Sequence, residues 1–189
     1  MPKIVDVEER HRQVSEAAWR VLVRDGLTEL SVRKVAAEAG LPPSSLRYSF
    51  PTQASVRDTA VALLIERLAE RVARQTARGS ATEQARAILL ELLPLDAERR
   101  IEMEVLLALG AMAMTDDALQ KSHDQVLDAV RALCARALEL LGAPRVELAA
   151  THALVDGLAL HLVRQPRAHD TQWAVEVLDI HIARLRAER

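Results

Sequence analysis

The residues best suited to molecular recognition lie in the segment Ser44-Ser45-Leu46-Arg47-Tyr48-Ser49. Hydroxyl groups can hydrogen-bond to phosphate oxygens, and an arginine such as Arg47 can bond both acceptor atoms on the major-groove edge of a guanine. These side chains therefore have the chemistry of a DNA contact, provided that one helix presents them together. The alternative is an ordinary surface helix on which Tyr48 only packs.

The preceding residues predict such a helix. Ser31 is a suitable N-cap, because its hydroxyl can accept a hydrogen bond from an unpaired first-turn N–H, and apolar residues then recur at helical spacing as far as Ala39. Gly40 can end that helix in a left-handed conformation, and the pair Pro42-Pro43 suits a turn followed by a first helical position. The sequence therefore predicts two short helices joined by a tight turn, the arrangement that places a recognition helix in the major groove.

The segment from Trp19 to Val56 resembles the DNA-binding segment of TetR-type transcriptional regulators, and this resemblance implies that Tyr48 bonds a phosphate while Ser45 and Arg47 lie nearest to the base edges. Arg47 and Gln53 stand where tyrosine and lysine are frequent in the family. The positions that carry the resemblance are Gly26, Ser31, Val35, Ala36, Ala39, Gly40, Leu46, Tyr48, Phe50, Pro51 and Thr52. The expected DNA contacts are Ser31, Arg33, Ser44, Ser45, Arg47, Tyr48, Ser49, Thr52 and Gln53.

Three downstream segments resemble the effector domain of the BetI-like branch of that family: residues 93–100, Ala118-Leu119 and Asp156-Gly157-Leu158. The resemblance implies a homodimeric repressor, a palindromic double-stranded DNA operator and a small-molecule effector of unknown identity. It also implies a mechanism by linkage. The effector favours a conformation in which the two recognition helices no longer match successive major grooves, about 34 Å apart.

Composition predicts an all-α protein of about nine helices. Long segments rich in Ala, Leu, Arg and Glu contain few glycines, and no long run of alternating β-branched residues indicates a sheet. We expect a helix-turn-helix DNA-binding domain in residues 1–51 and a ligand-binding and dimerisation domain in residues 52–189. Caps and helix breakers place the helices near residues 7–25, 31–39, 44–50, 52–78, 81–93, 96–114, 116–141, 144–164 and 171–187.

The charge distribution weakly favours this division. Residues 1–57 hold nine Lys and Arg against seven Asp and Glu, a net charge of +2, while the remainder holds 16 against 20, a net charge of −4. This asymmetry agrees with a DNA-facing N-terminal domain. The small size of the positive charge is the best support for a rival hypothesis, a helical protein-interaction module without specific DNA binding.

Cysteine usage and hydropathy indicate a cytoplasmic location. The lone Cys134 cannot form an internal disulfide, which fits a reducing compartment, and its apolar helical context predicts a packing role. No signal peptide is recognisable, and no apolar run is expected to approach the roughly 20 residues that span a bilayer. We therefore expect no membrane partner.

Candidate effector-binding residues form a stripe on one predicted helix. Met103, Leu107, Gly110 and Met114 share a helix face, and Met112 lies nearby. Plain core packing is one explanation. Because Met side chains adapt to irregular cavities and the resemblance implies a cavity in this domain, a pocket lined by Met103, Leu107, Met112 and Met114 is the other.

A dimer interface is predicted on the last two helices. Ala149, Ala153, Gly157 and His161 are spaced by four. A glycine inside a helix costs about 1 kcal/mol relative to alanine, and the close approach of another helix is a physical reason to accept that cost. The last helix is apolar on two sides, one of which carries Trp173, Val177 and Ile180. One side is expected to pack inward, and the other to meet a second copy of the chain around a two-fold axis.

A helical-bundle enzyme is the second rival, and it would need titratable groups that converge. The sequence contains no recognisable Ser-His-Asp arrangement, phosphate-binding glycine loop or Cys/His cluster. His152 and Asp156 are four residues apart, which predicts an ion-paired buried carboxylate rather than a metal or ligand site. We therefore expect no enzymatic activity, no cofactor and no metal.

Overall fold

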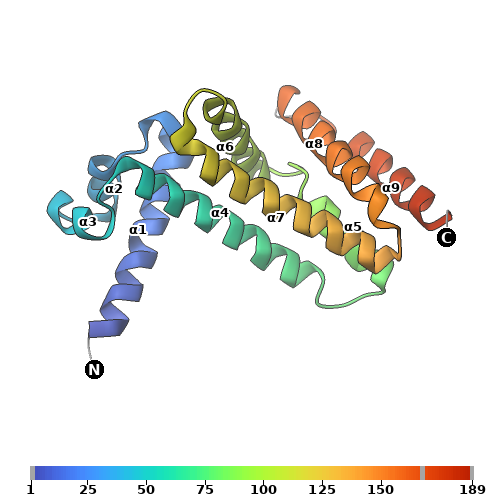
Figure 1. Ribbon diagram of the computed structural model, residues 1–189, viewed down its shortest axis with the longest axis horizontal. Coiled ribbons are helices and arrows are strands. Elements are labelled where there is room, and N and C mark those ends of the chain that lie inside the picture. Colours follow the sequence, from blue (N-terminus) through green and yellow to red (C-terminus); the bar gives the residue numbers. More distant parts are fainter. Residues whose placement is uncertain (1–2, 167–168, 188–189) are drawn as a thin grey trace. The chain divides into compact units, whose positions relative to one another are not determined.

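The computed structural model describes residues 3–166 and 169–187, and within these ranges the chain is helical without a strand (Figure 1). The predicted all-α class is confirmed, and the helix ends lie within about four residues of those predicted. The helices are α1 (Lys3–Asp25), α2 (Val32–Ala39), α3 (Pro43–Ser49), α4 (Gln53–Gln75), α5 (Ala81–Glu91), α6 (Ala97–Ala113), α7 (Asp117–Leu141), α8 (Leu148–Arg164) and α9 (Gln172–Ala187), with short 3-10 helices at Leu27–Glu29 and Arg145–Glu147.

Local capping explains why these ends could be predicted. The Ser31 hydroxyl accepts from the backbone N–H of Lys34 at 3.3 Å, and Asp96 accepts from that of Arg99 at 2.8 Å. Gly40 ends α2 with φ 67°, a left-handed conformation that favours glycine. Thr52, Asp116 and Asp170 cap α4, α7 and α9 through backbone N–H bonds of 3.1, 3.0 and 2.9 Å.

The chain forms two compact units. The N-terminal unit comprises Met1–Glu66 and Val105–Asp124, and the C-terminal unit comprises Arg67–Glu104 and Gln125–Arg189. Helices α4, α6 and α7 each contribute a segment to both units. The functional boundary between residues 51 and 52 stays a prediction.

The core of the N-terminal unit holds α3 in place. Val14, Ala18 and Leu22 of α1 are at most 2 % exposed, and Leu46 and Phe50 are 1 % and 3 % exposed. The Gln13 side-chain amide also donates to the Ala39 carbonyl at 3.0 Å, which fastens α1 to the end of α2. As a result, α3 has one buried side and one side that faces away from the core.

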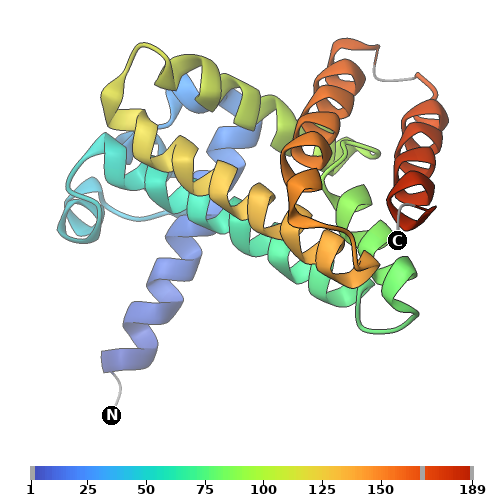
Figure 2. The same cartoon turned by 45° about the vertical axis from the view of Figure 1, so that its right-hand side comes forward.

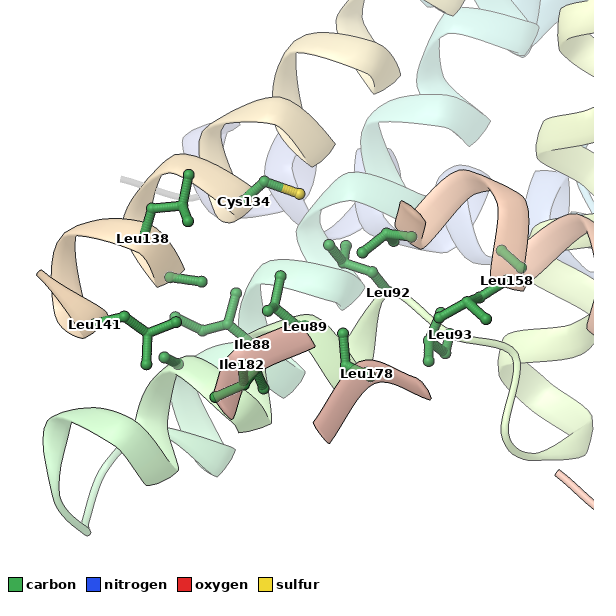
Figure 3. Packing of buried hydrophobic residues seen from close by; sticks show 14 of the residues in the cluster. Ile88, Leu89, Leu92, Leu93, Cys134, Leu138, Leu141, Leu158, Leu178 and Ile182 are labelled. Atoms are coloured by element: carbon green, nitrogen blue, oxygen red, sulfur yellow. The ribbon is translucent and has the colours of Figure 1, made fainter. Parts of the chain in front are cut away.

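The core of the C-terminal unit is built from aliphatic side chains of α5, α7, α8 and α9 (Figure 3). Helix α5 packs against α9, and α8 lies beside α9 (Figure 2). Cys134 is fully buried in this cluster. Burial raises the pKa of its thiol to about 12, and the nearby charge of Asp156 adds to the rise. Cys134 is therefore a neutral thiol at pH 7, in agreement with a packing role.

The expectation that no stretch of the chain has the hydropathy of a membrane span is wrong for helix α8. Residues Arg145–Arg164 reach that level by length and composition alone. Leu148, Val155, Leu158 and Leu162 of this helix pack in the core, while alanines occupy much of its opposite face. The high hydropathy thus arises because the helix is apolar on two faces, and a core helix passes the same test.

Candidate nucleic-acid interface

The helix-turn-helix is formed by α2, the turn at residues 40–42 and α3. Leu41 N–H donates to the Ala36 carbonyl at 2.9 Å, which closes the end of α2. Pro42 is extended, with ψ 137°, and Pro43 is the first residue of α3. Because Leu46 anchors the inner side of α3, Ser44 and Arg47 remain exposed on its outer side. This is the geometry needed to present side chains to a groove.

The other predicted contacts lie at the ends of neighbouring helices. Arg33 is exposed on the first turn of α2, and Thr52 is exposed at the start of α4. Ser31 and Ser45 are half-buried. The side chains of Tyr48, Ser49 and Gln53 lie outside the described residues. The role of all nine residues as DNA contacts stays a prediction.

The cations between residues 9 and 47 are divided into two groups. Four cations of the first group are neutralised by carboxylates. Arg12 pairs with Glu9 at 2.6 Å, and Lys34 pairs with Glu29 at 2.8 Å. Glu38 pairs with Arg20 at 2.8 Å and with Arg24 at 2.7 Å, and Arg24 also reaches Asp25 at 2.9 Å. The hydrogen bond from Arg24 lowers the pKa values of Asp25 and Glu38, so both carboxylates are ionised at neutral pH.

Three exposed arginines form the second group. Among the described side chains, Arg10, Arg33 and Arg47 have no ion-pair partner. They lie on α1, α2 and α3, so each helix of the DNA-binding unit carries an uncompensated positive charge. The small net charge of residues 1–57 therefore conceals three unpaired arginines, because Glu9, Asp25, Glu29 and Glu38 are paired with other cations. Counting charges along the sequence could not reveal this, and it missed Arg10.

Comparisons with known proteins show which regulators the chain is similar to. The family described as BetI-type transcriptional repressor, C-terminal, matches residues 81–187. The chain is 36 % identical over 173 residues to the HTH-type transcriptional regulator PksA of Bacillus subtilis (strain 168), covering 88 % of this chain and 84 % of PksA. A crystal structure of a transcriptional regulator from Rhodococcus sp. Rha1 has a TM-score of 0.76 at 28 % identity, covering 93 % and 95 % of the two chains. The crystal structure of the multidrug binding protein EbrR complexed with malachite green has a TM-score of 0.67 at 28 % identity. The match covers 90 % of this chain and 96 % of the EbrR chain.

The fold and the matches define the class of protein, a helix-turn-helix transcriptional regulator. The chain belongs to the TetR family and carries a C-terminal domain of the BetI type. The predicted family is thus confirmed.

The residues predicted to line an effector pocket are divided between the two units. Met103 is half-buried against the core of the C-terminal unit, and Leu107 and Met112 are half-buried in the N-terminal unit. Met114 is 84 % exposed, because α6 ends at Ala113 and the shared helix face does not extend to residue 114. This exposure gives no support to a pocket-lining role for Met114, and the pocket stays a prediction.

Two hollows of the C-terminal unit have other linings. One, of about 210 Å³, lies at the start of α6 and the end of α8 and includes Arg100 and Leu162. The other, of about 330 Å³, runs along α5 and includes Leu90 and Arg99. No group of three His, Cys, Asp or Glu side chains that could hold a metal ion occurs among the described residues.

His152 and Asp156 lie side by side as their spacing predicts, with Nε2 and Oδ2 3.5 Å apart, and they form an ion pair when the imidazole is protonated. The expectation of a buried carboxylate is wrong, because the Asp156 side chain is 59 % exposed. Desolvation by nearby atoms nevertheless raises the pKa of Asp156, and His152 opposes part of that rise. Asp156 is thus a solvent-accessible carboxylate in a partly apolar setting.

An open apolar face on α8 and α9 corresponds to the predicted dimer interface. Ala149, Ala153 and His161 are exposed, and a Cβ atom placed on Gly157 would meet nothing within 4 Å. On α9, Val177 and Ile180 are 36 % and 70 % exposed, whereas Ala174, Leu178, Ile182 and Leu185 are buried. Trp173 is half-buried, and its indole N–H donates to the Gln165 side chain at 3.4 Å. The interface itself stays a prediction.

Proposed function

We propose that the protein is a homodimeric repressor that binds a palindromic operator through its helix-turn-helix and is released by a small organic molecule. The observation that supports DNA binding best is the combination of an anchored α3 with uncompensated arginines. Leu46 and Phe50 fix the inner side of α3, while Arg47 of α3 and Arg33 of α2 are exposed and unpaired. A protein-interaction module would have no need for this arrangement of charge.

Selection from random duplexes with purified protein tests the proposal. We expect an enriched palindrome, with affinity that falls as salt concentration rises. Arg47→Ala is expected to relax discrimination by about 1–3 kcal/mol at one base pair of each half-site. The matched control Arg20→Ala, which removes an arginine paired with Glu38, should leave the preference unchanged. Recovery of no enriched palindrome would support the interaction-module hypothesis instead.

The effector is proposed to be an organic cation. EbrR, 26–28 % identical to this chain, is known in complexes with imidazole, proflavin and malachite green, and the last two are organic cations. The chain has four aromatic residues, Trp19, Tyr48, Phe50 and Trp173, and the first three lie in or beside the DNA-binding helices. An aromatic cage of the kind that binds quaternary ammonium groups therefore cannot form in the effector domain. We assign the countercharge to the carboxylate of Asp156, which is accessible in the single chain and partly desolvated, and which lies beside Ala153 and Gly157 of the proposed dimer face.

Titration with malachite green, followed by its absorbance, tests this assignment. Asp156→Asn is expected to weaken binding by about 10–100-fold, because a charged contact in a partly desolvated setting contributes about 1.5–3 kcal/mol. The control Asp128→Asn removes an exposed carboxylate of α7 and should leave binding unchanged. Equal binding by the two variants would exclude Asp156, and absence of binding by the wild type to both malachite green and proflavin would count against an organic cation as effector.

A further inference from the structure

The segment of α1 around residues 11–13 is fastened beside the recognition helix by two side chains. The Gln13 amide donates to the carbonyl of Ala39, the last residue of α2, at 3.0 Å. The rings of His11 and Phe50 have centroids 5.6 Å apart and a tilt of 40°, and Phe50 directly follows α3. Since Phe50 is 3 % exposed, its position is fixed by the core. Residues 11–13 of α1 are therefore held against Ala39, before the turn, and against Phe50, after α3.

Helix geometry places Arg10 between these two contacts. Successive residues of an α-helix are rotated by about 100° around the helix axis. Viewed along this axis, Arg10 therefore points about 60° from the direction of Gln13 and about 100° from that of His11, so that its direction lies between the two. Val14, the first buried residue among the described side chains of α1, lies one turn further along. Arg10 thus projects from the side of α1 that faces the turn and α3, but beyond the edge of the core, where it is exposed.

Arg10 and Arg12 differ in electrostatic state although they are two residues apart. Arg12 is held by Glu9 through bonds of 2.6, 2.8 and 3.2 Å and points to the other side of the helix. Arg10 has no ion-pair partner among the described side chains and is the third free arginine beside Arg33 and Arg47.

We propose that Arg10 binds the phosphate backbone of the DNA beside the groove that α3 enters, so that α1 is a third element of the interface. The partner is DNA because the unpaired Arg10 lies on the side of α1 that faces the turn and α3, the segment proposed to enter the groove, whereas carboxylates already neutralise the cations further along α1. The contact adds affinity without sequence preference. This inference rests on the proposed DNA-binding function.

The test compares Arg10→Ala with Arg12→Ala on the duplex selected by the wild-type protein, over a series of salt concentrations. A dimer would lose two phosphate contacts in Arg10→Ala. The slope of log affinity against log salt should then fall by about 1.8, and affinity at 0.15 M salt should fall by roughly 5–30-fold for operator and unrelated duplexes alike. Arg10→Lys should keep most of the slope, which excludes misfolding as the cause, and Arg12→Ala should match the wild type.

The outcomes separate the inference from the function on which it rests. A wild-type slope in Arg10→Ala, or an equal loss in Arg12→Ala, would overturn the contact while leaving DNA binding intact. A wild-type protein that binds no duplex would overturn the proposed function and this contact together.

Discussion

Replacing Arg71 by methionine is expected to lower the free energy of unfolding of the C-terminal unit by about 3–5 kcal/mol. Arg71 of α4 donates to both carboxylate oxygens of Glu102 on α6, at 2.9 and 2.6 Å, and to Glu91 on α5 at 3.1 Å. The three side chains are only 15 %, 6 % and 9 % exposed. Removal of the guanidinium would leave two carboxylates out of water without their main cation. Urea denaturation, followed by circular dichroism, measures the loss.

A neighbouring arginine supplies the control. Arg74 lies one turn further along α4, is 66 % exposed and reaches Glu70 at 3.6 Å. Arg74→Met is expected to cost no more than about 0.5 kcal/mol, because exposed ion pairs contribute little. The double variant Arg71→Met/Glu102→Met should recover much of the loss, since an apolar pair replaces a buried ionic one. Equal effects of Arg71→Met and Arg74→Met would show that the buried network contributes nothing.

The helices of this protein could be predicted from sequence because their ends are encoded locally. Ser31, Gly40 and Pro43 act on backbone groups within four residues, so their effect does not depend on the rest of the fold. The helix-turn-helix and its anchors Leu46 and Phe50 followed from such signals. Met114 shows the limit of this reasoning, because a difference of one residue in the end of α6 moves a predicted stripe residue onto the surface.

The charged contacts could not be predicted, because they join residues far apart in the chain. Arg71 and Glu102 are separated by 31 residues, and Arg100 donates to the carbonyls of Leu162, Val163 and Gln165 at 3.0, 2.5 and 2.7 Å. Composition gives the number of charges but not their partners. The same ambiguity concealed Arg10, since the sequence does not say which arginines are neutralised. For an interface with DNA, the unpaired charges matter more than the net charge.

Gly157→Leu is expected to dissociate the proposed dimer without harming the folded chain. In the single chain, nothing lies within 4 Å of a Cβ atom at residue 157, so the first side-chain carbon of the leucine meets no steric clash. Leucine also favours a helix by nearly 1 kcal/mol over glycine. At a two-fold interface the added side chain would occur twice. An overpacking cost of about 1–3 kcal/mol for each copy would weaken the dimer by about 2–6 kcal/mol, or roughly 30-fold to more than 10⁴-fold.

Analytical ultracentrifugation over a range of concentrations measures this effect, and urea denaturation at low concentration checks the fold of the monomer. Ala132→Leu, which enlarges an exposed alanine on α7, is the matched control and should leave the dimer unchanged. Because two half-sites are bound together only by a dimer, operator affinity should fall with dimer affinity in Gly157→Leu. An unchanged dimer in this variant would exclude the α8 face as the interface, and a wild-type monomer would exclude the proposed assembly.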